Sequence, residues 1–140
     1  MTRRQWYMLP VALLAGGCFG VGGAGITDVS PAQTYRPPGS QDTWQIAGSL
    51  ETALPSETAG GEDDYVKTLI VSINGEQVIH GAICSFCQDW PSDSKYAPLT
   101  GRYKDHAVHT DCFFKGEGLV SSTTECAVFV DNEQAAKLTF

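Results

Sequence analysis

The sequence is poor in charge, and poorest in positive charge. Charged residues make up 18% of its 140 residues, and 9 basic residues stand against 16 acidic ones, so the formal net charge is −7. Nucleic-acid binding takes much of its affinity from Lys and Arg side chains that neutralise phosphates, so this balance disfavours a nucleic-acid partner. A basic partner would instead be attracted.

The short motifs of common catalytic centres are also missing. The sequence contains no G-x-S-x-G elbow, no P-loop, no dinucleotide fingerprint and no H-E-x-x-H pair. The acidic cluster at residues 62–64 lacks the spacing of a calcium loop. His106 and His109 are three residues apart, which places them on opposite faces of a strand. We therefore predict a protein that is not an enzyme, with no catalytic residue, no metal site and no cofactor.

No apolar run reaches the roughly 20 residues that a membrane-spanning helix needs. A short apolar run at residues 8–15 follows Arg3 and Arg4 and precedes two glycines. This order is typical of a secretory signal, so we predict a signal peptide over residues 1–17. TRRQWY at residues 2–7 also resembles a twin-arginine signal, which leaves the export route open.

The end of this segment resembles the lipobox of bacterial lipoproteins. The match is LLAGGC at residues 13–18, but Ala15 stands where the usual motif has Leu. The resemblance implies that Cys18 is acylated and anchors the protein to a membrane. The non-Asp residue Phe19 then implies the outer membrane, facing the periplasm. Cleavage after Ala24 is the alternative, and it would give a soluble periplasmic or secreted protein.

Residues 18–42 have no apolar periodicity and are dominated by Gly, Pro, Ser, Thr and Ala. Such a composition buries too little apolar surface to offset the entropy lost on ordering. We predict a flexible tether here, semi-stiff at Pro37 and Pro38. The folded β domain is then expected over residues 43–140, with its core at 65–140.

Strand patterns fill the rest of the chain. Two β-branched runs, 67–73 and 77–84, flank Asn74-Gly75, a pair that favours a two-residue hairpin turn because both residues accept a positive φ. Further strands are predicted over 44–50, 99–104, 106–114, 123–130 and 134–140, with turns at Asp105 and Asp131-Asn132. The expected fold is all-β: a small antiparallel meander of about six to seven strands that forms a barrel or a sandwich.

The β domain contains four cysteines, and an even number in a small exported domain suggests two disulfides. If the strands around residues 115–123 pair with Cys112 opposite Cys126, three residue pairs fall on one face. These pairs are Cys112 and Cys126, Thr110 and Val128, and Val108 and Val130. The register favours a Cys112–Cys126 disulfide and, by elimination, Cys84–Cys87. The alternative joins the CxxC pair to the other two cysteines.

The sequence CSFC at residues 84–87 also fits a redox pair. However, it ends a predicted hairpin and runs into Trp90 and Pro91, whereas a redox CxxC begins a helix. Zinc would need a second closely spaced pair, and Cys112 and Cys126 are too far apart for that pattern. A structural disulfide is therefore the favoured role.

Aromatic residues could form an exposed binding patch, but we predict that they mainly fill the core. The residues concerned are Trp44, Trp90, Tyr96 and Tyr103.

Together these features predict a non-catalytic, lipid-anchored cell-envelope protein whose β domain binds or helps to assemble another envelope protein. One alternative is a periplasmic thiol–disulfide or metal-handling protein that uses Cys84 and Cys87. Another, suggested only by the acidic charge, is an inhibitor of a basic secreted enzyme.

Overall fold

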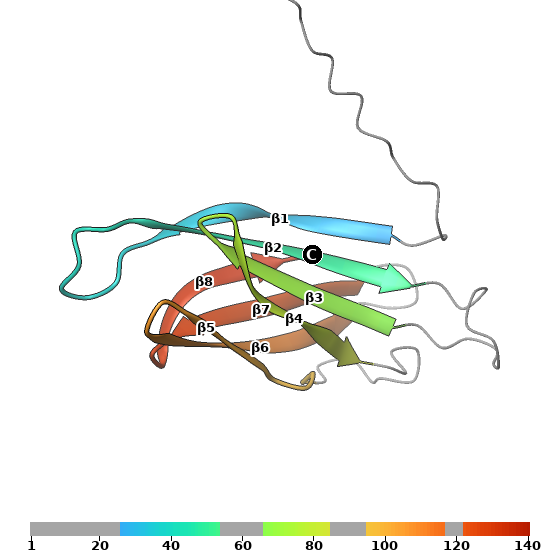
Figure 1. Cartoon of the computed structure of the whole chain (residues 1–140). Coiled ribbons are helices and arrows are strands. Elements are labelled where there is room, and N and C mark those ends of the chain that lie inside the picture. Colours follow the sequence, from blue (N-terminus) through green and yellow to red (C-terminus); the bar gives the residue numbers. More distant parts are fainter. Residues whose placement is uncertain (1–25, 54–65, 85–94, 117–121) are drawn as a thin grey trace, which may run out of the picture.

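The computed structural model describes residues 26–53, 66–84, 95–116 and 122–140, which form two stacked antiparallel sheets (Figure 1). One sheet has the strand order β1-β2-β3-β4 and the other β5-β6-β7-β8. The strands are β1 (Ile26–Tyr35), β2 (Trp44–Ala53), β3 (Val66–Ile73), β4 (Glu76–Cys84), β5 (Leu99–Tyr103), β6 (His106–Gly116), β7 (Ser122–Val130) and β8 (Glu133–Thr139). The predicted all-β meander is confirmed, with eight strands and as a sandwich of two sheets.

A single core lies between the sheets and is built from alternate residues of the strands. In β3 these are Leu69, Val71 and Ile73, all fully buried. The intervening residues of β3 are half-buried, on its other face. The burial of β3 thus follows the two-residue period of a strand with one face turned to the core.

Three two-residue turns lie at the same end of the sandwich, at the left in Figure 1, and we call this the turn end. Asn74 and Gly75 have φ values of 51° and 81°, as their predicted hairpin turn requires. Asp131 and Asn132 also have positive φ, at 48° and 67°. The turn predicted at Asp105 includes Lys104, which has a φ of 51°. Asn and Asp tolerate this conformation better than most residues, so these connections are specified locally.

Strand β1 corrects the predicted boundary between tether and domain. Residues 26–35 were expected to belong to a flexible tether over 18–42, but they pair with β2 along their length. Only Ser30 and Tyr35 of this edge strand are buried, so it needs no apolar alternation. Its stability comes from backbone pairing, which composition does not reveal. Pro31 is accommodated because the register shifts between Ser30 and Gln33, forming a bulge.

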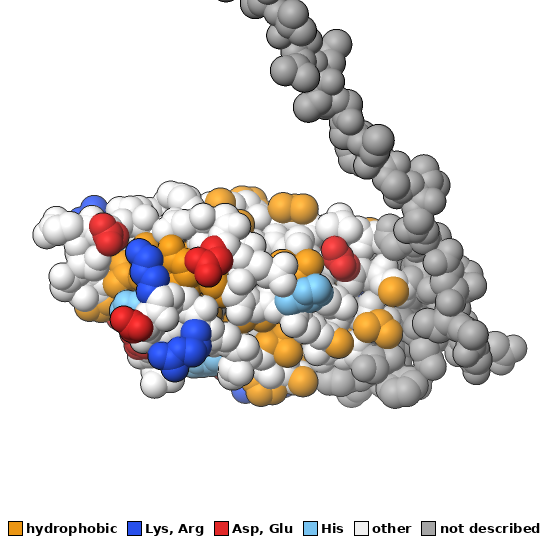
Figure 2. All heavy atoms as spheres, viewed as in Figure 1, with side chains coloured by type: hydrophobic (Ala, Val, Ile, Leu, Met, Phe, Trp, Pro, Cys, Tyr) orange, Lys and Arg blue, Asp and Glu red, His pale blue; other side chains and the backbone are white. Residues whose placement is uncertain are grey.

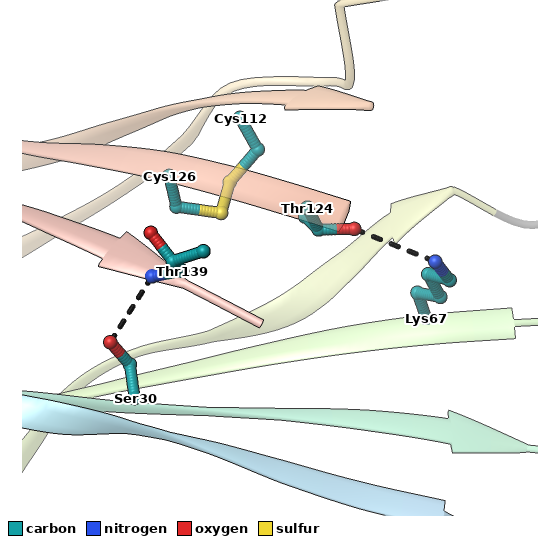
Figure 3. The surroundings of a disulfide bond; sticks show 6 residues. All are labelled: Ser30, Lys67, Cys112, Thr124, Cys126 and Thr139. Atoms are coloured by element: carbon teal, nitrogen blue, oxygen red, sulfur yellow. Dashed lines mark hydrogen bonds between the residues drawn. A yellow bond between two sulfur atoms is a disulfide. The ribbon is translucent and has the colours of Figure 1, made fainter. Parts of the chain in front are cut away.

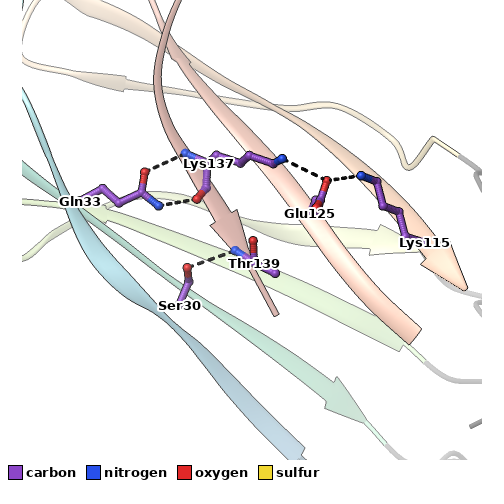
Figure 4. Close-up of polar contacts among 6 residues, drawn as sticks. All are labelled: Ser30, Gln33, Lys115, Glu125, Lys137 and Thr139. Atoms are coloured by element: carbon purple, nitrogen blue, oxygen red, sulfur yellow. Dashed lines mark hydrogen bonds and ion pairs between the residues drawn. The ribbon is translucent and has the colours of Figure 1, made fainter. Parts of the chain in front are cut away.

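The bulge lets β1 hold the edge of β8 with side chains. Because of it, Ser30 and Gln33 both face the core side although they are three residues apart. The Gln33 amide pairs with the backbone N–H and C=O of Lys137, and the Ser30 hydroxyl accepts a hydrogen bond from the Thr139 N–H (Figure 4). Side chains here take the place of a backbone ladder, so the two sheets approach each other without joining into a closed barrel.

At the opposite lateral edge, β5 crosses close to β4. A Cβ atom on Gly101 would lie 2.0 Å from the backbone oxygen of Val78, which leaves no room for a side chain. Glycine at this position therefore allows the two edge strands to approach.

Candidate functional site

The disulfide predicted from strand register is present. Cys112 and Cys126 are directly opposite in β6 and β7, with Cα atoms 4.0 Å apart, and both are fully buried. The neighbouring pairs occur as predicted, with Thr110 opposite Val128 and Val108 opposite Val130. The bond lies inside the sandwich at the end opposite the turns (Figure 3), which we call the disulfide end. Its burial indicates a structural role.

The other predicted cysteine sites are described only in part. Cys84 ends β4, is 5% exposed and is itself disulfide-bonded. Cys87 and Cys18 lie outside the described residues, so the Cys84–Cys87 pairing and the acylation of Cys18 stay predictions.

A lysine near the disulfide faces the interior, and sequence reasoning missed it. Lys67 belongs to the inward row of β3, at the disulfide end. Its ammonium lies 3.5 Å from the Thr124 hydroxyl of the facing sheet (Figure 3). It also lies 5.6 Å from the centre of the Phe114 ring. Burial lowers the pKa of Lys67, and the negative charge of Asp28 partly opposes this. The signal available in KTLIVSI was a charged residue in register with Leu69 and Val71.

Tyr96 completes this polar cluster. It is 2% exposed, and its hydroxyl forms a hydrogen bond with Thr124. Burial raises the pKa of Tyr96, and the hydrogen bond to Thr124 partly offsets that rise. The cluster of Lys67, Thr124 and Tyr96 therefore links the two sheets through hydroxyl groups.

His106 and His109 do not contact each other, because they lie on opposite faces of β6. His106 packs edge-on against Trp44 and pairs with the Asp131 carboxylate. That carboxylate also accepts a hydrogen bond from the Ala107 N–H. Both contacts lower the pKa of Asp131, and the contact with His106 has the larger effect. His109 is on the other face of β6 and stacks on Phe129, with ring centres 4.7 Å apart. Within the described ranges, no three His, Cys, Asp or Glu residues are grouped to hold a metal.

Three of the aromatic residues considered for a binding patch are core residues, as predicted. Trp44, Tyr96 and Tyr103 are 2%, 2% and 5% exposed. Trp44 makes edge-on contacts with Tyr35 and Tyr103. Trp90 lies outside the described residues.

The outer face of the second sheet carries a network of opposite charges. Glu125 of β7 is 2.7 Å from Lys115 of β6 and 3.5 Å from Lys137 of β8 (Figure 4). These lysines lower the pKa of Glu125, chiefly through the Lys115 hydrogen bond. On the face in Figure 2, acidic side chains lie singly and Lys and Arg form no continuous patch. Pairs at this exposure contribute little to stability, so they mainly keep the surface soluble.

The first half of β1 is different, because it exposes apolar side chains at a sheet edge. Ile26 and Val29 are 54% and 71% exposed, the highest values among the described large apolar residues. Among the described residues, β8 forms hydrogen bonds with β1 at Ser30 and Gln33, and β2 is the only strand that pairs with residues 26–29. We call Ile26–Val29 the free edge and take it as the candidate functional site. The sequence analysis placed it in the tether.

The chain matches no family model, no curated protein and no solved structure. The described part of the chain contains no helix that is long and apolar enough to cross a membrane.

Proposed function

We propose that this protein is a non-catalytic, lipid-anchored component of the cell envelope whose β-sandwich binds another envelope protein through the free edge at Ile26–Val29. The observation that carries the proposal is a strand edge that no second described strand pairs with and that exposes apolar residues. Such edges bind other chains unless they are covered or blocked by charge, and protein–protein recognition by strand addition uses them.

The position of the free edge supports this function. Seven residues, 19–25, lie between Cys18 and Ile26, so eight Cα–Cα steps join the two. Fully extended, they would span at most about 28 Å. Acylation of Cys18 would therefore hold the free edge close to the membrane surface, where it would meet other membrane-associated proteins. The match of LLAGGC to the lipobox and the preceding signal layout supply the anchor in this proposal.

Two measurements test the two parts of the proposal. Replacing Cys18 with Ser should abolish labelling by a radioactive fatty acid and release the protein from membranes. A variant that stays in the membrane fraction would contradict the lipid anchor.

A photo-reactive amino acid at Val29 should cross-link a specific envelope protein in living cells. The same group at Thr100, an exposed position on β5, is the matched control. Equal cross-linking from both positions, or none from Val29, would contradict binding at the free edge.

A further inference from the structure

We infer that the free edge receives an extended strand of the partner that places a Lys or Arg residue opposite Asp28. This inference rests on the proposed function and specifies the chemistry of the partner. The two halves of β1 differ in their neighbours. In the second half, Ser30 and Gln33 hold β8 by side-chain hydrogen bonds, whereas the first half has a described neighbour on one side only.

The arrangement of side chains favours a strand over a membrane surface. Ile26 is opposite Thr52 and Asp28 is opposite the buried Leu50, so Ile26 and Asp28 point to the core side. Val29 points to the other face. Insertion into a lipid surface would need both apolar residues on one face. An added strand covers both faces, because its own side chains alternate in the same way.

Asp28 determines which strand fits. It is the only charged residue of β1, it is exposed, and it makes no ion pair within 4 Å in the described part of the chain. The ammonium of Lys67, whose pKa Asp28 raises, instead contacts Thr124 and the Phe114 ring. Residues directly opposite in a sheet share a face, and opposite charges there stabilise pairing. A cationic residue opposite Asp28 would supply that contact.

The same carboxylate disfavours a second copy of this chain as the occupant. Two copies of β1 related by a two-fold axis must pair antiparallel with core-side residues opposite core-side residues. Centred on Asp28, this pairing puts the two carboxylates opposite each other. Centred on Thr27, it puts Asp28 opposite Ile26. Neither register gives Asp28 a cation, and charge at an edge is a common defence against self-association.

A peptide titration tests the inference. The probe is a capped nine-residue peptide of alternating Thr and Val with Lys at its centre, labelled for fluorescence anisotropy, and a second peptide has Glu in place of Lys. The full-length protein in detergent micelles should bind the Lys peptide about tenfold more tightly than the Glu peptide. Asp28→Lys should reverse this preference. Asp42→Lys, an equal charge change in an exposed loop, should leave it unchanged.

Amide exchange measured with the Lys peptide bound should slow within residues 26–29 and not within 100–103. The inference would be overturned if neither peptide binds. It would also be overturned if both peptides bind with equal affinity and Asp28→Lys does not change this. Two other outcomes would also overturn it: a dimer that Ile26→Asp dissociates, or binding of the Cys18→Ser protein to phosphatidylcholine vesicles that depends on Val29. If Val29 still cross-links a partner in cells while the peptide fails, the proposed function stands and only this inference falls.

Discussion

The two ends of the sandwich are held together in different ways. At the turn end, side chains that flank tight turns bond to neighbouring backbone: Asn74 accepts a hydrogen bond from the Gln45 N–H, and Asp131 accepts one from the Ala107 N–H. Aromatic rings pack behind them around Trp44. At the disulfide end, a buried disulfide joins β6 to β7 within one sheet, and Lys67 and Ser30 form hydrogen bonds with the facing sheet.

This difference matches a division between stability and the proposed binding. Three two-residue turns and the aromatic packing around Trp44 stabilise the turn end. The free edge at Ile26–Val29 lies at the disulfide end, where the first sheet extends past the hydrogen bonds to β8. The disulfide joins two strands of the second sheet and so does not constrain β1 directly.

The largest expected effect tests the turn end. Trp44→Ala should lower the free energy of unfolding by about 3–5 kcal/mol, because it removes a buried ring packed on Tyr35, Tyr103 and His106. Urea unfolding followed by circular dichroism would measure it. A loss below about 1 kcal/mol would show that this aromatic cluster is not the main support of that end.

Removing the disulfide should lower the free energy of unfolding by less than Trp44→Ala does. Replacing both Cys112 and Cys126 with Ala should cost about 3 kcal/mol, since the bond closes a loop of 13 residues, while the far-UV spectrum keeps its strand signal. Replacing Cys84 and Cys87 should cost less, because a short loop restricts the unfolded chain little. The reverse order would indicate that the CSFC cysteines carry more of the stability. Loss of biological activity from the second pair alone would favour the thiol–disulfide or metal-handling alternative.

Lys67→Met should raise the free energy of unfolding at neutral pH, by a few tenths to about 1 kcal/mol. Burial lowers the pKa of Lys67, so its charged form is disfavoured in the fold. That penalty is complete below the folded pKa and disappears as pH rises to the ordinary value of 10.5. The advantage of the variant should therefore narrow as pH rises towards 10.5. A destabilised variant would mean that the contacts with Thr124 and Phe114 outweigh the cost of burial.

The smallest effect concerns acid sensitivity at the turn end. The pKa of Asp131 is lowered by its contacts with His106 and the Ala107 N–H. Its contribution to stability is therefore present above the ordinary Asp pKa of about 4 and is lost as pH falls through the lower folded value. Asp131→Asn should flatten the decline of stability below about pH 4, measured by thermal unfolding across pH. Asp105→Asn serves as the control, and an equal change in both variants would contradict the role of this pair.

The features predicted correctly were those with short-range signatures. The Asn74-Gly75 turn was predictable because few residue pairs accept two positive φ values. The register of Cys112 and Cys126 was predictable because side chains alternate with a period of two, and only one pairing places the cysteines and their apolar neighbours on the same face.

The candidate site was not predictable in the same way. Strand β1 was assigned to the tether because an edge strand with exposed side chains has the composition of a linker. Its ordering depends on pairing with β2 and on Gln33, which bonds to Lys137, a residue 104 positions later in the chain. Lys67 was overlooked because its contact with Thr124 joins residues 57 positions apart.

The all-β class, the turns and the Cys112–Cys126 pairing could be predicted from local patterns, because alternation and positive φ are properties of a few neighbouring residues. The start of the domain, the inward orientation of Lys67 and the part of β1 without a second described neighbour emerged only from contacts between the two sheets. Those outcomes depend on how the edges of two sheets meet, and the residues that hold the edges together are distant in the chain and carry no local pattern.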